Sequence, residues 1–244
     1  MIKFGKITRF RFFVPELLSI SDNKTYVKTL VDNILKRDIE QRYKIAYKAA
    51  FERLAHHLLN ISPTIVIPKT LAEVFHFKSE HTAKNYVEHL KQAYLLIGVE
   101  KYSQKSKVRV VQEKVYAVDV AMMNQRDNAF AGDNLGHRLE TIVLIHLVRK
   151  CKMDDLDVYY LNERYGECDF VVCKETLWFK PYRCHTTSWP KKHEKGKLEG
   201  FCLPPDKQDV PIFFLTDHES ATIEKDGCQI KVQPVYEWCL DLGL

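Results

Sequence analysis

The fold class that the sequence predicts is α+β: a helical domain containing a winged helix, followed by an α/β domain. Residues 1–124 hold 21 Lys and Arg against 12 Asp and Glu, whereas residues 125–244 hold 16 against 20. All seven cysteines lie after residue 150. Apolar residues recur at helical spacing in the basic half and form strand-like runs in the acidic half. We therefore expect domains at residues 23–124 and 125–244, preceded by a short segment at residues 1–22.

The composition excludes several protein classes. A chain of 244 residues with 45% hydrophobic and 28% charged residues can bury one or two ordinary cores, so it is neither disordered nor collagen-like. No run approaches the roughly 18 apolar residues that a membrane span needs. An odd number of cysteines without a secretory leader is typical of reduced thiols. The sequence thus predicts a cytoplasmic protein with no membrane contact.

Two helices are predicted at the start of the basic half, over residues 25–45 and 46–59. Asp22 or Asn23 can cap the first helix, and a turn at residues 60–63 ends the second. The apolar face of the first helix carries Val27, Leu30, Val31, Ile34, Leu35 and Ile39.

Residues 71–94 carry a helix-turn-helix pattern, in which Ser79 opens the longer second helix. The predicted inward stripe of this helix consists of Ala83, Val87, Leu90 and Tyr94. The predicted outward stripe is polar and consists of Lys78, Thr82, Asn85, His89 and Gln92. Because outward polar side chains can hydrogen-bond to a ligand, this helix is the expected recognition helix of a winged helix.

Two β-rich runs at residues 96–102 and 108–111 flank a polar turn, and they predict the wing. Such a module suits duplex DNA, because a helix can enter the major groove while Lys and Arg of the wing neutralise phosphates. The predicted nucleic-acid-binding residues are Lys78, Thr82, Asn85, His89, Lys105, Lys107 and Arg109. The alternative is a winged helix that packs against a protein, with a merely solvated polar stripe.

The acidic half predicts a sheet with helices. An apolar helix is expected at residues 139–148, a helical segment near 191–201 and a final helix at 235–242. Strands are expected at residues 115–119, 157–161, 167–173, 177–185, 210–216 and 229–235.

Two carboxylates lie in apolar surroundings, Glu140 in the predicted helix and Asp169 in a predicted strand. Buried carboxylates are costly unless they are paired or bind a metal. Mg²⁺ takes one or two carboxylates with waters, and it could activate water for phosphodiester hydrolysis beside a Lys. The alternative is that Glu140 pairs with a nearby Arg and Asp169 lies at an exposed strand end. The cysteines lack the CxxC spacing of zinc sites, so ordinary buried thiols are expected.

An ordered set of segments runs from about residue 23 to the C-terminus. It comprises residues 34–39 with Arg42 and Tyr43, then Thr82, Tyr86 and Leu90, residues 114–119, Gly136, Leu139, Glu140 and Val143, residues 158–160, 166–172 and 230–235, and Trp238. This set resembles the C-terminal part of prokaryotic AAA-type ATPases, in which the ATPase core is followed by a winged helix and a nuclease-like domain of unknown function.

The resemblance implies a restriction-endonuclease-like fold for the last domain, where a helix Glu and a strand Asp hold a metal and a Lys on the following strand assists. Glu140 and Asp169 match the first two positions and are the implied metal ligands. Residues 179–184 offer no acidic-x-Lys pair, and Pro181 disturbs that strand. Lys180 or Arg183 would have to replace the missing Lys. We therefore expect a catalytically degenerate nuclease fold.

The phosphate-binding loop of those ATPases is missing, because the sequence has nine glycines and no G-x-x-x-x-G-K-[ST]. We expect no ATP hydrolysis, with residues 1–22 as a remnant of the segment that leads out of an ATPase core. The sequence predicts a non-enzymatic module without a cofactor that binds DNA or a protein partner, for example a separate ATPase core. The alternative is a Mg²⁺-dependent nuclease that uses Glu140 and Asp169.

Overall fold

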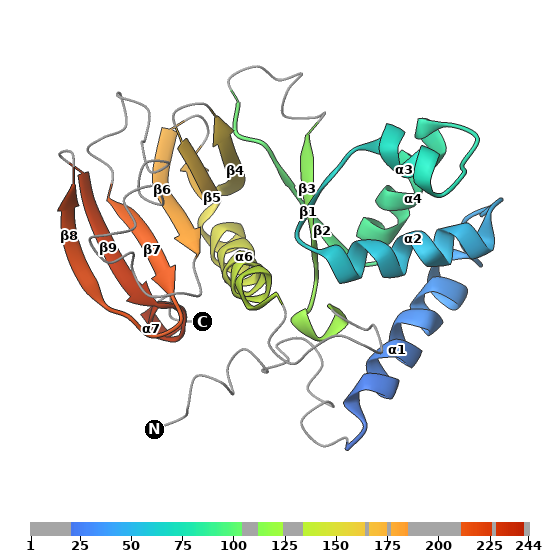
Figure 1. Cartoon of the computed structure of the whole chain (residues 1–244), viewed down its shortest axis with the longest axis horizontal. Helices are drawn as coiled ribbons and strands as arrows, with labels where there is room; N and C mark the ends of the chain where they lie inside the picture. Colours follow the sequence, from blue (N-terminus) through green and yellow to red (C-terminus); the bar gives the residue numbers. More distant parts are fainter. Residues whose placement is uncertain are drawn as a thin grey trace. The chain divides into compact units, whose positions relative to one another are not determined.

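The computed structural model describes residues 21–103, 112–123, 134–163, 166–174, 177–184, 211–225 and 228–241. It confirms the predicted α+β class, with helices and two separate sheets. The chain divides into two compact units (Figure 1). The described part of the helical unit is residues 21–98 and 112–123, and that of the sheet unit is residues 99–103 and 134–241 with the gaps above.

The helical unit begins with α1 (Asn23–Asn33), which continues directly into a π-helical segment, η3 (Ile34–Ile39). Asp22 caps α1 by accepting a hydrogen bond from the Thr25 backbone N–H at 3.2 Å. The predicted apolar face is buried at Val27, Val31, Leu35 and Ile39. The helical run ends earlier than the predicted residue 45, because the wider turns of η3 redirect the chain before α2 (Lys48–Ile61).

After α2, the helical unit continues with one short strand, two helices and two further strands: β1 (Thr64–Val66), α3 (Pro68–Val74), α4 (Glu80–Gln92), β2 (Leu96–Glu100) and β3 (Glu113–Ala117). The three strands form a sheet in the order β1-β3-β2, with β1 antiparallel to β3. The short strand β1 was not predicted. A predicted strand at residues 115–119 was assigned to the acidic half, and the structure instead places it as β3 in this small sheet. The predicted strand at 108–111 lies outside the described residues.

The sheet unit is built on α6 (Leu135–Asp154) and a six-stranded sheet in the order β4-β5-β6-β7-β9-β8. The strands are β4 (Asp157–Glu163), β5 (Gly166–Lys174), β6 (Leu177–Cys184), β7 (Ile212–Thr216), β8 (Ala221–Lys225) and β9 (Cys228–Pro234). β4, β5 and β6 are antiparallel neighbours, and β7 is parallel to both β6 and β9. β8 was not predicted, and the predicted helical segment near residues 191–201 lies outside the described residues.

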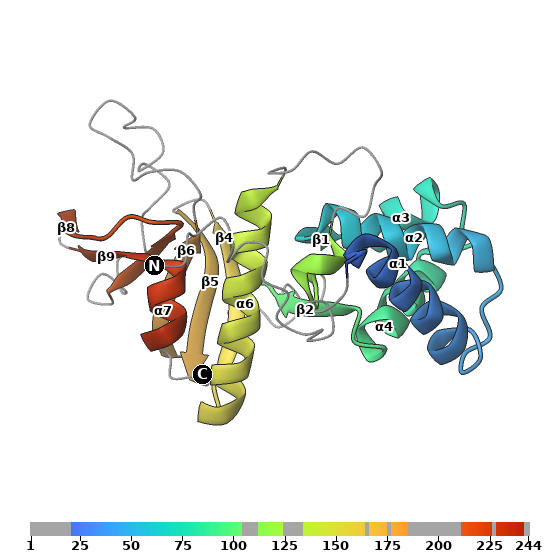
Figure 2. The same cartoon turned by 90° about the horizontal axis from the view of Figure 1, so that it is seen from below.

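The two helices among the described residues of the sheet unit contact the sheet and each other. α6 packs against β4, β5 and β6, and α7 (Val235–Asp241) packs against β7 and β9, so the two lie side by side (Figure 2). Residues 139–147 of α6 are all buried. A second apolar cluster includes Cys168, Val171, Phe214 and Ile230. The described helices include none that is long and apolar enough to span a membrane.

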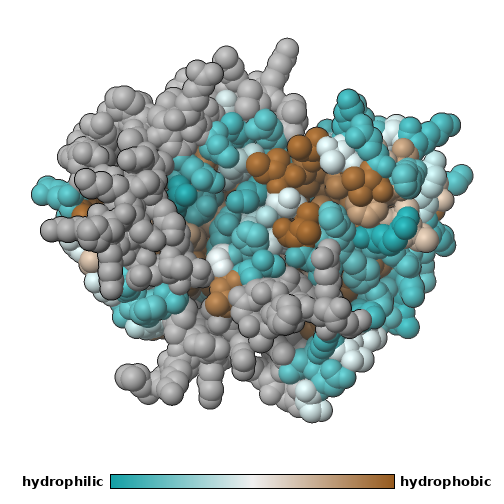
Figure 3. Space-filling view, viewed as in Figure 1, coloured by the Kyte–Doolittle hydropathy of each residue, from teal (hydrophilic) through white to brown (hydrophobic). Residues whose placement is uncertain are grey.

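On the face that Figure 3 shows, the described residues of the helical unit form an apolar surface area. It lies over β1 and α3, where Ile65, Ile67 and Val74 are exposed. Because Ile65 and Ile67 alternate with the buried Val66, they lie on the outer side of the edge strand β1 and its extension.

Candidate nucleic-acid interface

The predicted helix-turn-helix is formed by α3 and α4. His76 adopts a left-handed backbone conformation with φ of 57°, and the Phe77 N–H donates to the Ala72 carbonyl at 2.9 Å. These contacts end α3 and turn the chain toward α4. Ser79 caps α4 by accepting a hydrogen bond from the Thr82 N–H at 3.2 Å. The cap fixes where α4 begins, and thereby which of its side chains face outward.

The buried face of α4 differs from the predicted inward stripe at one position. Ala83, Val87 and Leu90 are buried as predicted, together with Tyr86. Tyr94 is 78% exposed and does not belong to this stripe. The reason is that α4 ends at Gln92, after which Tyr94 takes φ of 55° and leaves the helical path.

The N-terminal half of α4 presents an open polar surface, which we call the α4 polar face. It consists of Lys78, His81, Lys84 and Asn85, all of which are exposed. The Asn85 amide and the His81 ring lie 3.3 Å apart, one helical turn from each other. Thr82, predicted as a contact residue, is half-buried, and its hydroxyl lies 3.1 Å from the Ser79 hydroxyl. Positions 81 and 84 were missed as candidates, although helical spacing places them beside Asn85.

The C-terminal half of α4 is partly covered: Gln92 is exposed, as the predicted outward stripe requires, whereas His89 is half-buried. The His89 ring stacks on the Tyr43 ring with 3.9 Å between centroids and 12° between planes. Burial lowers the pKa of His89, which favours the neutral ring. The Tyr43 hydroxyl donates a hydrogen bond to the Gln92 Oε1 at 2.7 Å. Tyr43, in the chain that follows η3, therefore contacts the side chains of both His89 and Gln92.

Lys91 forms an ion pair with the small sheet. Its Nζ lies 2.7 Å from a Glu113 carboxylate oxygen on β3 and 3.0 Å from a Glu88 oxygen. Burial alone would lower the pKa of Lys91, but the hydrogen bonds and charges of the two carboxylates outweigh it and raise that pKa. A Cβ at Gly98 would collide with the Glu113 carboxylate. The glycine therefore provides the space that the Lys91–Glu113 ion pair needs. The wing residues Lys105, Lys107 and Arg109 lie outside the described residues.

The second predicted site lies in the sheet unit, on α6, β5 and β6. Glu140 is 7% exposed within α6. Asp169 accepts a hydrogen bond from the Cys184 backbone N–H at 2.7 Å. Around Asp169 the register of β5 against β4 shifts, since Cys168 faces Leu161 while Val171 faces Tyr159. The resulting bulge turns Asp169 toward the end of β6.

The two basic residues of β6, Lys180 and Arg183, contact residues other than Glu140 and Asp169. The Arg183 guanidinium donates to the Glu167 carbonyl at 2.6 Å and lies 3.4 Å from the Glu167 carboxylate. The Lys180 Nζ lies 5.7 Å from the centroid of the Phe213 ring. Among the described residues, no three His, Cys, Asp or Glu side chains lie close enough to hold a metal ion.

The described cysteines are free thiols inside or near the sheet core. Cys151, Cys168 and Cys173 are buried, while Cys184 and Cys239 are half-buried. Burial raises the pKa of Cys168 to about 12 and that of Cys151 to about 11. Because the thiolate is the reactive form, these raised pKa values disfavour reaction of the two thiols at neutral pH.

Comparison with known proteins gives two matches. Residues 14–132 match the family model of a domain of unknown function (DUF8612). An uncharacterized protein of Methanocaldococcus jannaschii is 26% identical over an alignment of 253 positions, which covers 98% of this chain and 54% of that protein. The chain thus spans about half the length of the curated relative it matches. No solved structure matches the chain.

Proposed function

We propose that the helical unit is a winged-helix module that binds duplex DNA through the α4 polar face. The observation that carries this proposal is the division of α4 into a buried face and an open polar face, starting at the Ser79 cap. A capped helix that projects its first turns is the element that helix-turn-helix proteins place in the major groove. The order of helices and strands around it, with β1-β3-β2 beneath, supports the same interpretation.

The side chains of the α4 polar face divide into two roles. Lys78 and Lys84 carry positive charge beside the positive end of the helix dipole, which favours phosphate oxygens. Asn85 offers a donor and an acceptor on one planar group, which matches the N6 and N7 edge of adenine. His81 supports the Asn85 amide from one turn earlier. Glu80 and Glu88 on the same helix limit the net charge, so we expect modest rather than tight binding.

Binding of the full chain to a blunt DNA duplex, measured by fluorescence anisotropy at two salt concentrations, tests this proposal. Lys84→Gln should weaken binding to all sequences and reduce the slope of log affinity against log salt by about 1. Asn85→Ala should weaken binding by roughly 1–3 kcal/mol at sequences that contain its preferred base and relax that preference. Lys28→Gln on the exposed face of α1 is the matched control. Equal effects of the changes at positions 84 and 28 would contradict the proposal.

For the sheet unit we propose a nuclease-like fold that binds a partner and does not catalyse a reaction. The expected partner is another protein, for example a separate ATPase core. The helix, three antiparallel strands and parallel fourth strand of the sheet unit support the nuclease-like topology. The engaged Asp169 and Arg183 side chains argue against an assembled catalytic centre.

A Mg²⁺-dependent nuclease that uses Glu140 and Asp169 is the competing function, favoured by the position of Asp169 at the bulge near the start of β5, beside the end of β6. Incubation with single- and double-stranded DNA and RNA, with Mg²⁺ or Mn²⁺, separates the two. We expect no cleavage by the wild-type chain. Cleavage that Asp169→Ala abolishes would overturn our preference, because contaminating nucleases would not respond to that substitution.

A further inference from the structure

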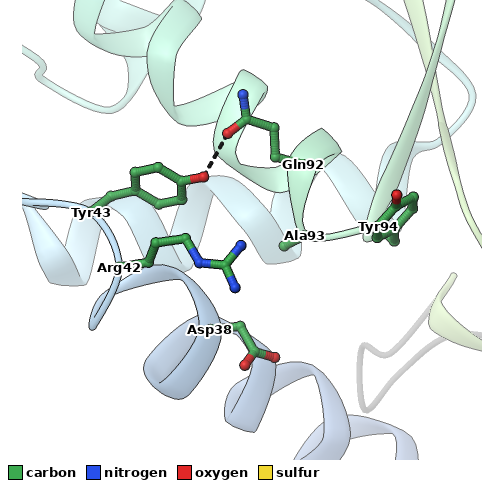
Figure 4. A pocket seen from close by; sticks show the side chains of 6 residues that line it. All are labelled: Asp38, Arg42, Tyr43, Gln92, Ala93 and Tyr94. Carbon is green, nitrogen blue, oxygen red and sulfur yellow. Dashed lines mark hydrogen bonds between the residues drawn. The ribbon is translucent and has the colours of Figure 1, made fainter.

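A small hollow lies at the C-terminal end of α4, away from the α4 polar face (Figure 4). Its volume is about 180 Å³. The residues that line it come from η3, from the chain that follows η3 and from the end of α4: Asp38, Arg42, Tyr43, Gln92, Ala93 and Tyr94. We call it the Arg42 hollow.

The π-helical turns of η3 build one wall of the hollow. The Glu40 N–H donates to the Leu35 carbonyl five residues earlier, and the Tyr43 N–H donates to the Ile39 carbonyl at 2.8 Å. These bonds bend the chain so that the side chains at positions 42 and 43 reach the end of α4. The Tyr43–Gln92 hydrogen bond and the Tyr43–His89 stack then hold this wall in place.

Two opposite charges line the hollow without neutralising each other. Figure 4 shows the Arg42 guanidinium between Tyr43 and Asp38, turned toward Ala93. Both Arg42 and Asp38 are exposed, and neither side chain makes an ion pair or hydrogen bond within the part of the chain that the structure describes. A guanidinium and a carboxylate therefore remain available to a ligand.

Tyr94 adds an aromatic ring at a position that disfavours it. Its φ of 55° lies in the left-handed region, where Gly or Asn usually ends a helix. The Leu95 N–H donates to the Leu90 carbonyl, and the Tyr94 N–H donates to the Lys91 carbonyl, as in a Schellman motif. The ring is 78% exposed and gains little from burial. Folding thus offers no reason for a tyrosine here, whereas stacking against a ligand does.

Most of the charged residues close in sequence to Arg42 are basic. Lys36, Arg37 and Lys44 are exposed close to it in sequence, and Glu40 is paired with Lys48 at 3.2 Å. Phosphate groups are therefore favoured near the Arg42 hollow. The volume corresponds to about six waters at about 30 Å³ each, which is below the roughly 300–1,000 Å³ of drug-sized ligand sites. One planar ring system fits this size.

We propose that the Arg42 hollow binds one unpaired nucleotide of a single-stranded segment. The base stacks on the Tyr94 ring, the Asp38 carboxylate accepts a hydrogen bond from the amino group of the base, and the Arg42 guanidinium binds a phosphate. This deepens the proposed function, because it adds a single-stranded ligand class to duplex binding by the α4 polar face. The preferred ligand of the full chain is then a duplex with a single-stranded tail.

Three probes test the proposal with the full chain: a short single-stranded oligonucleotide, a blunt duplex and the same duplex with a single-stranded tail. Tyr94→Gly should weaken binding to the tailed duplex and the oligonucleotide about tenfold and leave the blunt duplex unchanged. Arg42→Gln should do the same and also reduce the salt dependence, whereas Tyr94→Phe should bind like the wild type. Lys28→Gln, which removes a charge from α1, should change the binding of neither the oligonucleotide nor the tailed duplex.

Tyr94→Gly keeps the fold intact, because glycine adopts φ of 55° without strain. Its melting temperature should equal or exceed that of the wild type, so a loss of affinity cannot come from unfolding. The proposal is overturned if the wild type binds neither the oligonucleotide nor the single-stranded tail of the tailed duplex. It is also overturned if Tyr94→Gly and Arg42→Gln bind these two probes like the wild type. Failure of blunt-duplex binding to respond to Lys84→Gln would instead contradict the α4 polar face and leave the Arg42 hollow supported.

Discussion

Helices α4 and α6 both carry polar residues, yet α4 leaves several of them exposed, whereas α6 buries its polar residues between positions 139 and 147. On α4, Lys84 and Asn85 are exposed, and the apolar stripe occupies only one side. On α6, all residues from 139 to 147 are buried, including Glu140 and His146. A helix with one apolar stripe keeps a face for ligands, whereas a helix that is buried all round uses its polar groups internally. The available face of a helix, more than the residue type, decides which polar group can act on a partner.

The largest effect should come from shortening a core side chain of α6. Leu144→Ala removes a fully buried side chain and should lower the free energy of unfolding by roughly 2–5 kcal/mol. Urea unfolding followed by tryptophan fluorescence reports on this half of the chain, because all three tryptophans lie after residue 177. Lys84→Ala on α4 is the control and should change stability by less than about 0.5 kcal/mol when followed by circular dichroism. Similar losses for both variants would break the comparison.

A smaller effect is expected at the beginning of α4, which depends on a local side-chain cap. Ser79→Ala removes the acceptor for the Thr82 N–H and should cost about 1 kcal/mol of stability. Ser79→Thr keeps a hydroxyl and should restore most of this loss. Thermal unfolding followed by circular dichroism measures both variants. If the alanine and threonine variants melt alike, α4 is positioned by packing alone and its polar face does not depend on the cap.

The features of α4 that follow from nearby residues could be predicted from the sequence. The Ser79 cap and the buried Ala83, Val87 and Leu90 follow from helical spacing alone. His89 was misassigned to the exposed face because its covering residue, Tyr43, arrives through η3 from far along the chain. A π-helical turn has no sequence signature in apolar spacing, so the position of Tyr43 could not be foreseen.

The sheet unit shows the same limit. The helix and the main strands were predicted from apolar runs, and Glu140 was placed correctly in an apolar helix. The surroundings of Asp169 depend on a bulge and on the Cys184 backbone, which no spacing rule indicates. Short strands such as β1 and β8 were missed, because three to five residues carry too little periodicity.

The smallest expected effect concerns the pH dependence of stability, and it compares one histidine from each helix. On α6, the His146 ring donates to the Ile142 carbonyl at 2.9 Å and packs against Trp238, and burial lowers its pKa. Burial also lowers the pKa of His89 on α4. In the pH range between the lowered pKa and the usual value near 6.5, the unfolded chain binds more protons than the folded one. Stability is therefore fully present above about pH 6.5 and declines as the pH falls through the lowered pKa.

Free energies of unfolding measured from pH 7.5 to 5 test this sign. His146→Gln keeps a donor for the Ile142 carbonyl but cannot be protonated, so its stability should fall less steeply with decreasing pH than that of the wild type. His89→Gln should flatten the profile less, because His89 is only half-buried whereas His146 is 5% exposed. An unchanged slope for His146→Gln would mean that α6 tolerates a charged imidazole. The contrast between an exposed α4 and a buried α6 would then not hold at His146, where burial should have the larger effect on the pKa.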